Sequence, residues 1–149
     1  MPATSAPSQR TPRQLWMAIL ARASASDLAT LLQNHQAGGH EVLKPAEAGT
    51  VMVEARAGGS GSRFNLGEAT VTRCAIRLPG GTIGFSYALG RDRKKAELAA
   101  IADALLQDGD ATIAEGVEKL GTSQQAAREL ASRKAAATKV DFFTMVRGE

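Results

Sequence analysis

The sequence contains few of the residues that usually assemble an active site or a metal centre. Its 149 residues include a single cysteine, Cys74, and two histidines, His35 and His40. One cysteine cannot form an internal disulfide, and a structural zinc site takes four ligands, usually cysteine or histidine. Cys74 falls in the middle of an expected strand, with no histidine nearby in the sequence to activate it as a nucleophile. We therefore expect no catalytic residue, no metal and no cofactor in this chain by itself.

Long apolar runs are also absent, and aromatic residues make up only 4% of the chain. No apolar run approaches the ~20 residues that a membrane-spanning helix needs. Residues 1–11 are rich in proline, serine, threonine and alanine, and they lack the apolar stretch of a secretion signal. We expect residues 1–11 to be a frayed tail on a cytoplasmic protein that makes no membrane contact.

Charge of either sign is not concentrated in blocks. The chain has 18 lysine and arginine residues against 15 aspartate and glutamate residues, a net charge of +3. The two signs are interleaved, so non-specific nucleic-acid binding is not implied. The length fits one domain, which we place at residues 12–149. Much of the apolar content is alanine, which buries little area, and such a chain often gains stability from a partner.

Alternating apolar and polar residues predict strands in the middle of the chain. Residues 51–57, 68–78 and 82–89 each follow the period of two that is typical of a half-buried strand. A glycine-rich run separates the first two, and Pro79-Gly80-Gly81 closes a tight turn before the third. Residues 41–44 are expected to be a brief extended segment that Pro45 breaks. The pattern indicates an α+β fold built on an antiparallel meander of three to four strands.

Two short helices are predicted before the meander. Thr11-Pro12 is a typical helix start, and Ser26-Asp27 begins a second helix that Gly38-Gly39 ends. Such a pair could be a helix-turn-helix DNA reader, with the sheet as its ligand domain. The second helix offers no arginine or lysine at residues 33–36 to hold phosphates. A plain packing hairpin is therefore favoured, and the DNA-binding regulator is the alternative.

Helices are also predicted after the meander. Asp92 can cap a helix over residues 93–107. A short helix over residues 113–120 is then expected to stop at Gly121. A separate alanine-rich helix should run from Thr122 to about residue 138. The meander would thus be flanked by an N-terminal helix pair and by C-terminal helices.

A glycine-rich run is the first candidate for anion binding. Gly58, Gly59 and Gly61 could let backbone N–H groups converge on an anion, and Arg63 could complete a phosphate cradle. The same glycines would equally serve a connection between two strands that needs positive φ angles. The run leads into a strand and has no lysine, so it is not a Walker A loop.

The start of the expected helix at residue 93 is the second candidate. Arg91, Arg93, Lys94 and Lys95 place four cations where the helix dipole is positive, which is unfavourable unless an anion compensates. The alternative is a solvated charged turn whose long side chains point away into water. Arg91 is the strongest candidate, because a glycine precedes it and a helix cap follows.

The last apolar run, residues 140–146, is a candidate interface. Phe142, Phe143, Met145 and Val146 gather there, and they could fold onto the chain's own core or dock on another subunit. The alanine-rich helix before them offers little surface to receive them. A partner subunit is therefore favoured.

Several stretches match the pattern of one protein family in the same order. The most specific is VDFFTMVRG at residues 140–148. The others are WMA at 16–18, LARA at 20–23, GGSG at 58–61, residues 65–78, GRD at 90–92, AE at 96–97, DALL at 103–106 and residues 135–149. Together they resemble the PhnG family of the carbon–phosphorus lyase machinery, with which bacteria degrade alkylphosphonates. The resemblance spans nearly the whole chain, and residues 1–11 look longer than the family's usual start.

The resemblance implies a subunit of the core complex formed with PhnH, PhnI and PhnJ. In that family PhnG, PhnH and PhnI, helped by the ATPase-like PhnL, transfer a phosphonate to the ribose C1 of ATP and release adenine. With methylphosphonate the product is α-D-ribose 1-methylphosphonate 5-triphosphate. The nucleosidase-like chemistry is usually placed on PhnI, so this chain would be an essential companion. ATP would be a co-substrate of the complex, and no nucleic acid is implied as a partner.

The resemblance also suggests roles for the candidate residues. Arg63, Arg73 and Arg91 would help to neutralise the triphosphate or the phosphonate. The C-terminal segment, from about residue 139 to 149, would dock on PhnI through Asp141, Phe142, Phe143, Met145, Val146 and Arg147.

Overall fold

A computed structural model describes residues 9–35 and 39–142 of the chain. Its elements are α1 (Pro12–Arg22), α2 (Ala25–Leu31), β1 (Glu41–Arg56), the 3-10 turn η1 (Ala57–Gly59), β2 (Arg63–Arg77), β3 (Ile83–Leu89), α3 (Arg93–Gln107) and α4 (Ala111–Ala137). The strands form one antiparallel sheet in the order β1-β2-β3. Helices precede and follow the strands, so the predicted α+β class and meander are confirmed. Among the described residues, no helix is long and apolar enough to cross a membrane.

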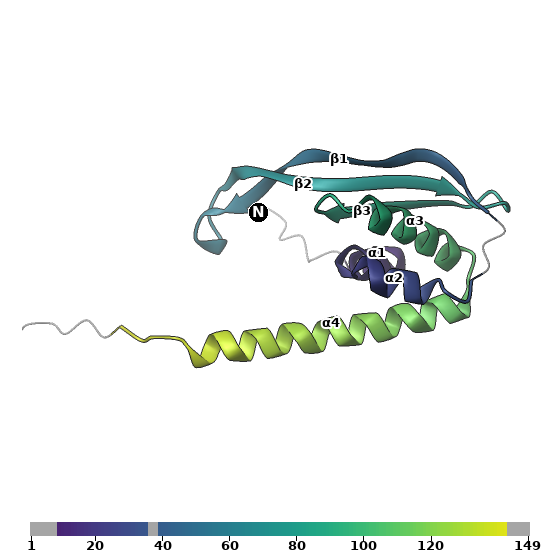
Figure 1. Cartoon of the computed structure of the whole chain (residues 1–149). Helices are drawn as coiled ribbons and strands as arrows, with labels where there is room; N and C mark the ends of the chain where they lie inside the picture. Colours follow the sequence, from purple (N-terminus) through teal and green to yellow (C-terminus); the bar gives the residue numbers. More distant parts are fainter. Residues whose placement is uncertain (1–8, 36–38, 143–149) are drawn as a thin grey trace, which may run out of the picture.

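The helices lie on one side of the sheet. Figure 1 shows α3 against the sheet, α1 and α2 beneath α3, and α4 along the far side of that helix pair. The largest fully buried apolar side chains, which come from four different elements, are Leu20, Leu28, Ile76 and Ile113. The core therefore lies between the sheet and the helices.

Small residues let α3 approach the sheet closely. Ala96, Ala100 and Ala104 are buried on α3, and Gly84 of β3 lies against Ala100 and Ala104. A Cβ atom at Gly84 would lie 1.9 Å from the backbone oxygen of Ala100. The alanines, each of which buries little area, thus permit close helix–sheet packing.

The predicted break at Pro45 is wrong, because β1 runs through it without interruption from Glu41 to Arg56. β1 is an edge strand that pairs only with β2 among the described strands. Its register shifts between Val42 and Lys44 and again between Lys44 and Glu47. A proline has no N–H to donate, and an irregular stretch of an edge strand is where it is tolerated.

β2 begins at Arg63, five residues before the predicted start at residue 68. β3 pairs with β2 only from Val71 to Arg77. Beyond that point, residues 50–56 and 63–70 form a two-stranded arm whose side chains are mostly exposed. The first five residues of β2 were not predicted, because Asn65 and Gly67 interrupt the alternation of apolar and polar residues.

Two helix boundaries also differ from the prediction. α2 begins at Ala25, with Ser24 as its cap, and it ends at Leu31, before the predicted stop at Gly38-Gly39. α4 is one helix of 27 residues, so the predicted break at Gly121 is wrong. Gly121 lies where helix α4 touches Ile19, and a Cβ there would be 2.8 Å from the Ile19 Cδ1 atom.

Candidate functional site

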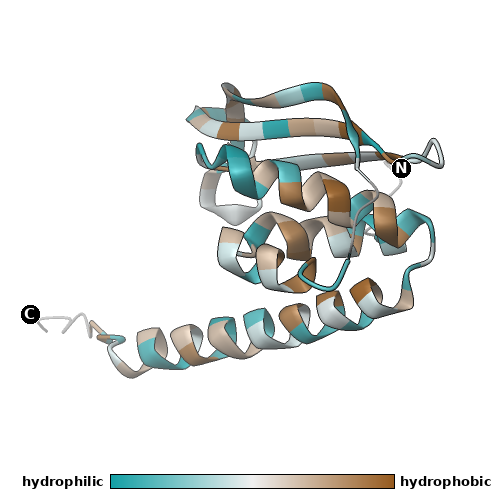
Figure 2. Ribbon diagram, turned by 45° about the vertical axis from the view of Figure 1, so that its right-hand side comes forward, coloured by the Kyte–Doolittle hydropathy of each residue, from teal (hydrophilic) through white to brown (hydrophobic). Residues whose placement is uncertain are grey.

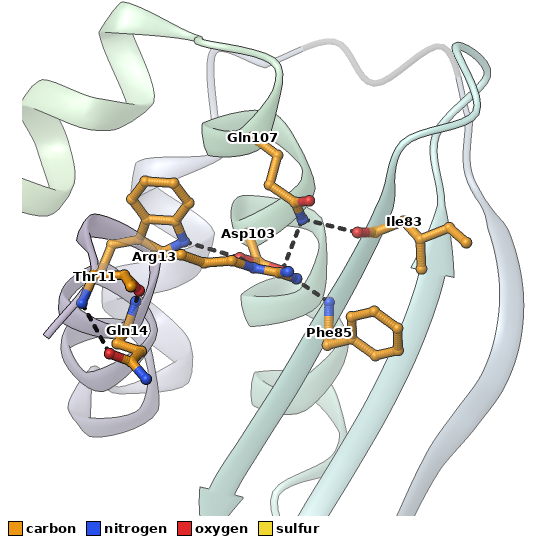
Figure 3. Close-up of polar contacts among 8 residues, drawn as sticks. Thr11, Arg13, Gln14, Ile83, Phe85, Asp103 and Gln107 are labelled. Atoms are coloured by element: carbon orange, nitrogen blue, oxygen red, sulfur yellow. Dashed lines mark hydrogen bonds and ion pairs between the residues drawn. The ribbon is translucent and has the colours of Figure 1, made fainter.

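The most connected polar group of the described chain is the carboxylate of Asp103. This side chain of α3 has no exposed surface. It accepts from the Arg13 Nη2 atom at 2.8 Å, the Trp16 Nε1 atom at 2.8 Å and the Phe85 backbone N–H at 3.0 Å (Figure 3). Gln107 adds a donor at 3.1 Å. One carboxylate thereby joins α1, α3 and β3.

The cluster of Arg13, Trp16, Asp103 and Gln107 with the Phe85 backbone has a structural role. Hydrogen bonding to Asp103 raises the pKa of Arg13, whose guanidinium also lies 5.8 Å from the centroid of the Phe85 ring. Both oxygens of Asp103 already accept hydrogen bonds, which leaves little capacity for a substrate. Sequence reasoning missed the cluster. The only signal was an aspartate inside the apolar stretch of residues 98–106.

A second polar feature is a hollow at the start of α3. It has a volume of about 360 Å3 and is lined by Arg91 and Arg93 together with Thr50, Thr70 and the β1 residues Ala48 and Gly49. None of the residues that line it is a carboxylate. Two arginines and two threonines thus lie around one hollow.

The backbone that carries Arg91 is firmly held. The Gly90 N–H donates to the Thr70 backbone oxygen at 2.9 Å, and the Thr72 hydroxyl donates to the Gly90 backbone oxygen at 2.7 Å. Asp92 caps α3 by accepting from the Lys95 N–H at 2.9 Å, as predicted. Within residues 9–35 and 39–142, none of Arg91, Arg93, Lys94 and Lys95 makes an ion pair.

The predicted glycine cradle lies at the tip of the arm. Gly58 and Gly59 have φ values of 60° and 84°, as a tight turn requires. The Gly61 N–H donates to the Ala57 backbone oxygen at 2.8 Å. Arg63 pairs with Glu54 at 3.2 Å. These contacts account for the glycines as a hairpin connection.

The predicted arginines do not converge on one point. Arg63 and Arg73 are ten residues apart on β2, or about 33 Å at 3.3 Å per residue. Arg73 pairs with Glu47 at 3.3 Å, and Lys44 binds the same oxygen at 2.9 Å. Hydrogen bonding to Lys44 is the main reason that the pKa of Glu47 is lowered. Of Arg63, Arg73 and Arg91, it is Arg91 that lines the hollow, together with Arg93.

The scarce histidine and cysteine side chains are spread out. His40 lies 2.8 Å from Glu97, and His35 lies 3.7 Å from Asp110. Cys74 is buried, and desolvation, assisted by the charge of Glu97, raises the pKa of its thiol. Among the described residues, no three potential metal ligands come together.

The predicted docking segment begins within the described chain and continues beyond it. Phe142 is 92% exposed and Val140 is 67% exposed. Asp141 lies 3.4 Å from Lys139. Phe143, Met145, Val146 and Arg147 lie outside the described residues.

These features define a small α+β protein with a hollow lined by two arginines and with a buried structural carboxylate, Asp103, whose two oxygens both accept hydrogen bonds. A family model described as phosphonate metabolism protein PhnG matches residues 11–148, so the chain belongs to the PhnG family. A relative from Rhizobium meliloti (strain 1021) is 45% identical over 109 residues, which are 72% of this chain and 70% of the relative. That relative is the alpha-D-ribose 1-methylphosphonate 5-triphosphate synthase subunit PhnG. The predicted family is confirmed, and neither match supports the DNA-binding alternative.

Proposed function

We propose that this chain is the PhnG subunit of an α-D-ribose 1-methylphosphonate 5-triphosphate synthase and that it acts in alkylphosphonate catabolism. The observation that carries the proposal is the family match over residues 11–148, together with 45% identity to a subunit of that synthase. The enzyme is the complex, and this chain is a companion subunit.

The reaction of the complex joins a phosphonate oxygen to the ribose C1 of ATP and expels adenine. ATP and an alkylphosphonate are the substrates at the level of the complex, in the cytoplasm. PhnI is the closest partner, with PhnH, PhnJ and PhnL as further ones. A companion role suits a chain whose one cysteine is buried.

Arg91 is the residue that we propose for anion binding. It shares the hollow with Arg93, Thr50 and Thr70, and no carboxylate lines that hollow. One guanidinium group can donate two parallel N–H hydrogen bonds to the oxygens of a phosphate group, and hydroxyl groups add further donors. The ligand class is therefore a polyphosphate or a phosphonate that reaches this surface at a subunit boundary.

The other predicted arginines require separate contacts. The tip of the arm, with Gly58, Gly59, Gly61 and Arg63, lies too far along β2 to share an anion with Arg73. We propose that Arg63 and Arg73 each bind a negatively charged group of a neighbouring subunit. That group would replace Glu54 as the partner of Arg63 and Glu47 as the partner of Arg73.

The end of the chain is the proposed contact with PhnI. An exposed phenylalanine, Phe142, begins an apolar sequence that continues through Phe143, Met145 and Val146. Asp141 and Arg147 flank it and would fix its register through charge.

An activity assay of the reconstituted synthase tests the anion site. Adenine release from ATP and methylphosphonate is followed with wild-type chain, with Arg91→Ala and with Arg77→Ala. Arg77 is the matched control, since it is an exposed arginine of the sheet that pairs with Glu41 at 3.2 Å, away from the hollow. We expect Arg91→Ala to lower the rate by about tenfold or more while the complex still assembles. Unchanged release would contradict the role of Arg91.

A further inference from the structure

The far half of α4 projects from the body of the protein. Every residue from 125 to 138 is exposed, and Figures 1 and 2 show this part of the helix standing free of the other elements. At 1.5 Å per residue, the thirteen residues 125–137 extend for about 20 Å. Most helix stability in proteins comes from packing one face against other elements, and this part of α4 has no such packing within the described chain.

One face of the far half continues the face that α4 already buries. Ile113 and Val117 are buried, and Leu120 packs against the same core. Gln124 ends the covered part by donating to the Ile19 backbone oxygen at 3.0 Å. Steps of three or four residues then keep to this face at Ala127, Ala131 and Ala135. α1 and α2 cover its first half, and no element of the described chain covers its second.

Cations border the uncovered face on both sides. Helical spacing places Arg128 on one flank and Lys134 on the other, and neither forms an ion pair with a described residue. Arg128 only donates to the Gln125 side-chain oxygen at 3.1 Å. The single carboxylate of residues 125–138, Glu129, lies on the opposite side of the helix. Two such faces placed together would bring cations against cations, which disfavours a second copy of this chain as the occupant.

We infer that the alanine face of α4, from Ala127 to Ala135, docks an amphipathic helix of another synthase subunit. The partner helix would present an apolar ridge to the alanines, whose small side chains permit helix axes to approach to about 8 Å. Its flanks would carry carboxylates that meet Arg128 and Lys134. The inference rests on the proposed function, which supplies the other subunits, and it adds the chemistry of the surface that this chain recognises. The exposed Val140 and Phe142 extend the same contact toward the chain end.

Two substitutions of equal size on opposite faces of α4 test this contact. Ala131→Trp obstructs the proposed face, whereas Ala136→Trp places the same bulk on the other side of the helix. Binding of each variant to the purified complex of the other synthase subunits is titrated. We expect Ala131→Trp to weaken binding by about tenfold or more and Ala136→Trp to bind within about twofold of wild type. Circular dichroism should show both variants to be as helical as wild type.

The charge of the partner surface is tested separately. The double variant Arg128→Glu with Lys134→Glu should also weaken binding by about tenfold or more, and added salt should weaken binding of the wild-type chain. If the wild-type chain binds but both tryptophan variants bind equally well, this inference is overturned and the proposed function stands. If the wild-type chain does not bind, the proposed function fails together with the inference. Self-association of the isolated chain that Ala131→Trp abolishes would overturn the acidic partner in favour of a second copy.

Discussion

Arg13 and Asp103 are 90 positions apart in the chain, and the Nη2 atom of the arginine donates to the Oδ2 atom of the aspartate at 2.8 Å. The aspartate side chain has no exposed surface, whereas 39% of the arginine side chain is exposed. Arg13 therefore closes the cluster from the solvent side, while Trp16 and the Phe85 N–H hold the carboxylate from within. The pair fastens α1 to the part of α3 that lies on the sheet.

Removing the carboxylate should destabilise the protein more than removing the arginine. Asp103→Ala leaves Trp16, the Phe85 N–H and a partly buried cation without their acceptor, and we expect a loss of about 3 kcal/mol. Arg13→Ala leaves the buried carboxylate of Asp103 without its cation but with three neutral donors, so a smaller loss of about 2 kcal/mol is expected. Urea unfolding of the two variants measures both values. A larger loss for Arg13→Ala would contradict the assignment of Asp103 as the centre of the cluster.

Gly84 should tolerate no side chain. Gly84→Ala would bring a Cβ to 1.9 Å from the Ala100 backbone oxygen, which cannot move without shifting α3. We expect a loss of stability of about 3 kcal/mol or failure to fold. Gly49→Ala is the control, since nothing lies within 4 Å of a Cβ at that strand position. Equal midpoints of thermal unfolding for the two variants would show that α3 does not pack on β3 at this distance.

The continuity of α4 can be tested at Gly121. A proline there would remove a helix hydrogen bond and clash with the preceding turn, at a cost of about 3 kcal/mol or more. Gly121→Ala should change stability by less than about 1 kcal/mol. Its Cβ would meet only the end of the Ile19 side chain, and alanine favours the helix. If two helices met at this residue, the proline variant would retain wild-type helicity in circular dichroism.

The thiol of Cys74 should be unreactive in the folded protein. Burial raises the pKa of the thiol above its usual value of 9.0. The thiolate therefore forms at a higher pH in the folded chain than in the unfolded chain. Alkylation by iodoacetamide should be slow until urea unfolds the protein. Because the unfolded chain loses this proton first, stability should fall as the pH rises above about 9. Cys74→Ala removes this thiol's contribution to the loss, and an equally steep loss in that variant would contradict the assignment.

The elements with strict periodicity could be predicted from the sequence. The alternation in residues 82–89 and the cap at Asp92 each depend on neighbours in the chain, and β3 and α3 formed where they were expected. The predicted breaks at Pro45 and Gly121 were wrong, because the prediction rested on the usual tendency of proline to end strands and of glycine to end helices. In the folded protein an irregular edge strand accommodates the first, and a contact with Ile19 explains the second.

The candidate site could be predicted only in part. Arg91 and Arg93 were identified from their place at the start of a helix, and the structure adds Thr50 and Thr70 beside them. The two threonines come from strands that pair at Thr50 and Thr70, a register that local pattern does not reveal. Asp103 was missed as a cluster because its donors Arg13 and Phe85 come from distant parts of the chain.

The most direct test of membership in the synthase is to omit this chain from a reconstituted mixture of PhnI, PhnH and PhnL. Adenine release from ATP and methylphosphonate is measured without the chain and after it is added back in equal amount. We expect release to be lost without the chain and to return in proportion to the amount added. Full release in its absence, or no recovery when it is restored, would contradict the proposed role.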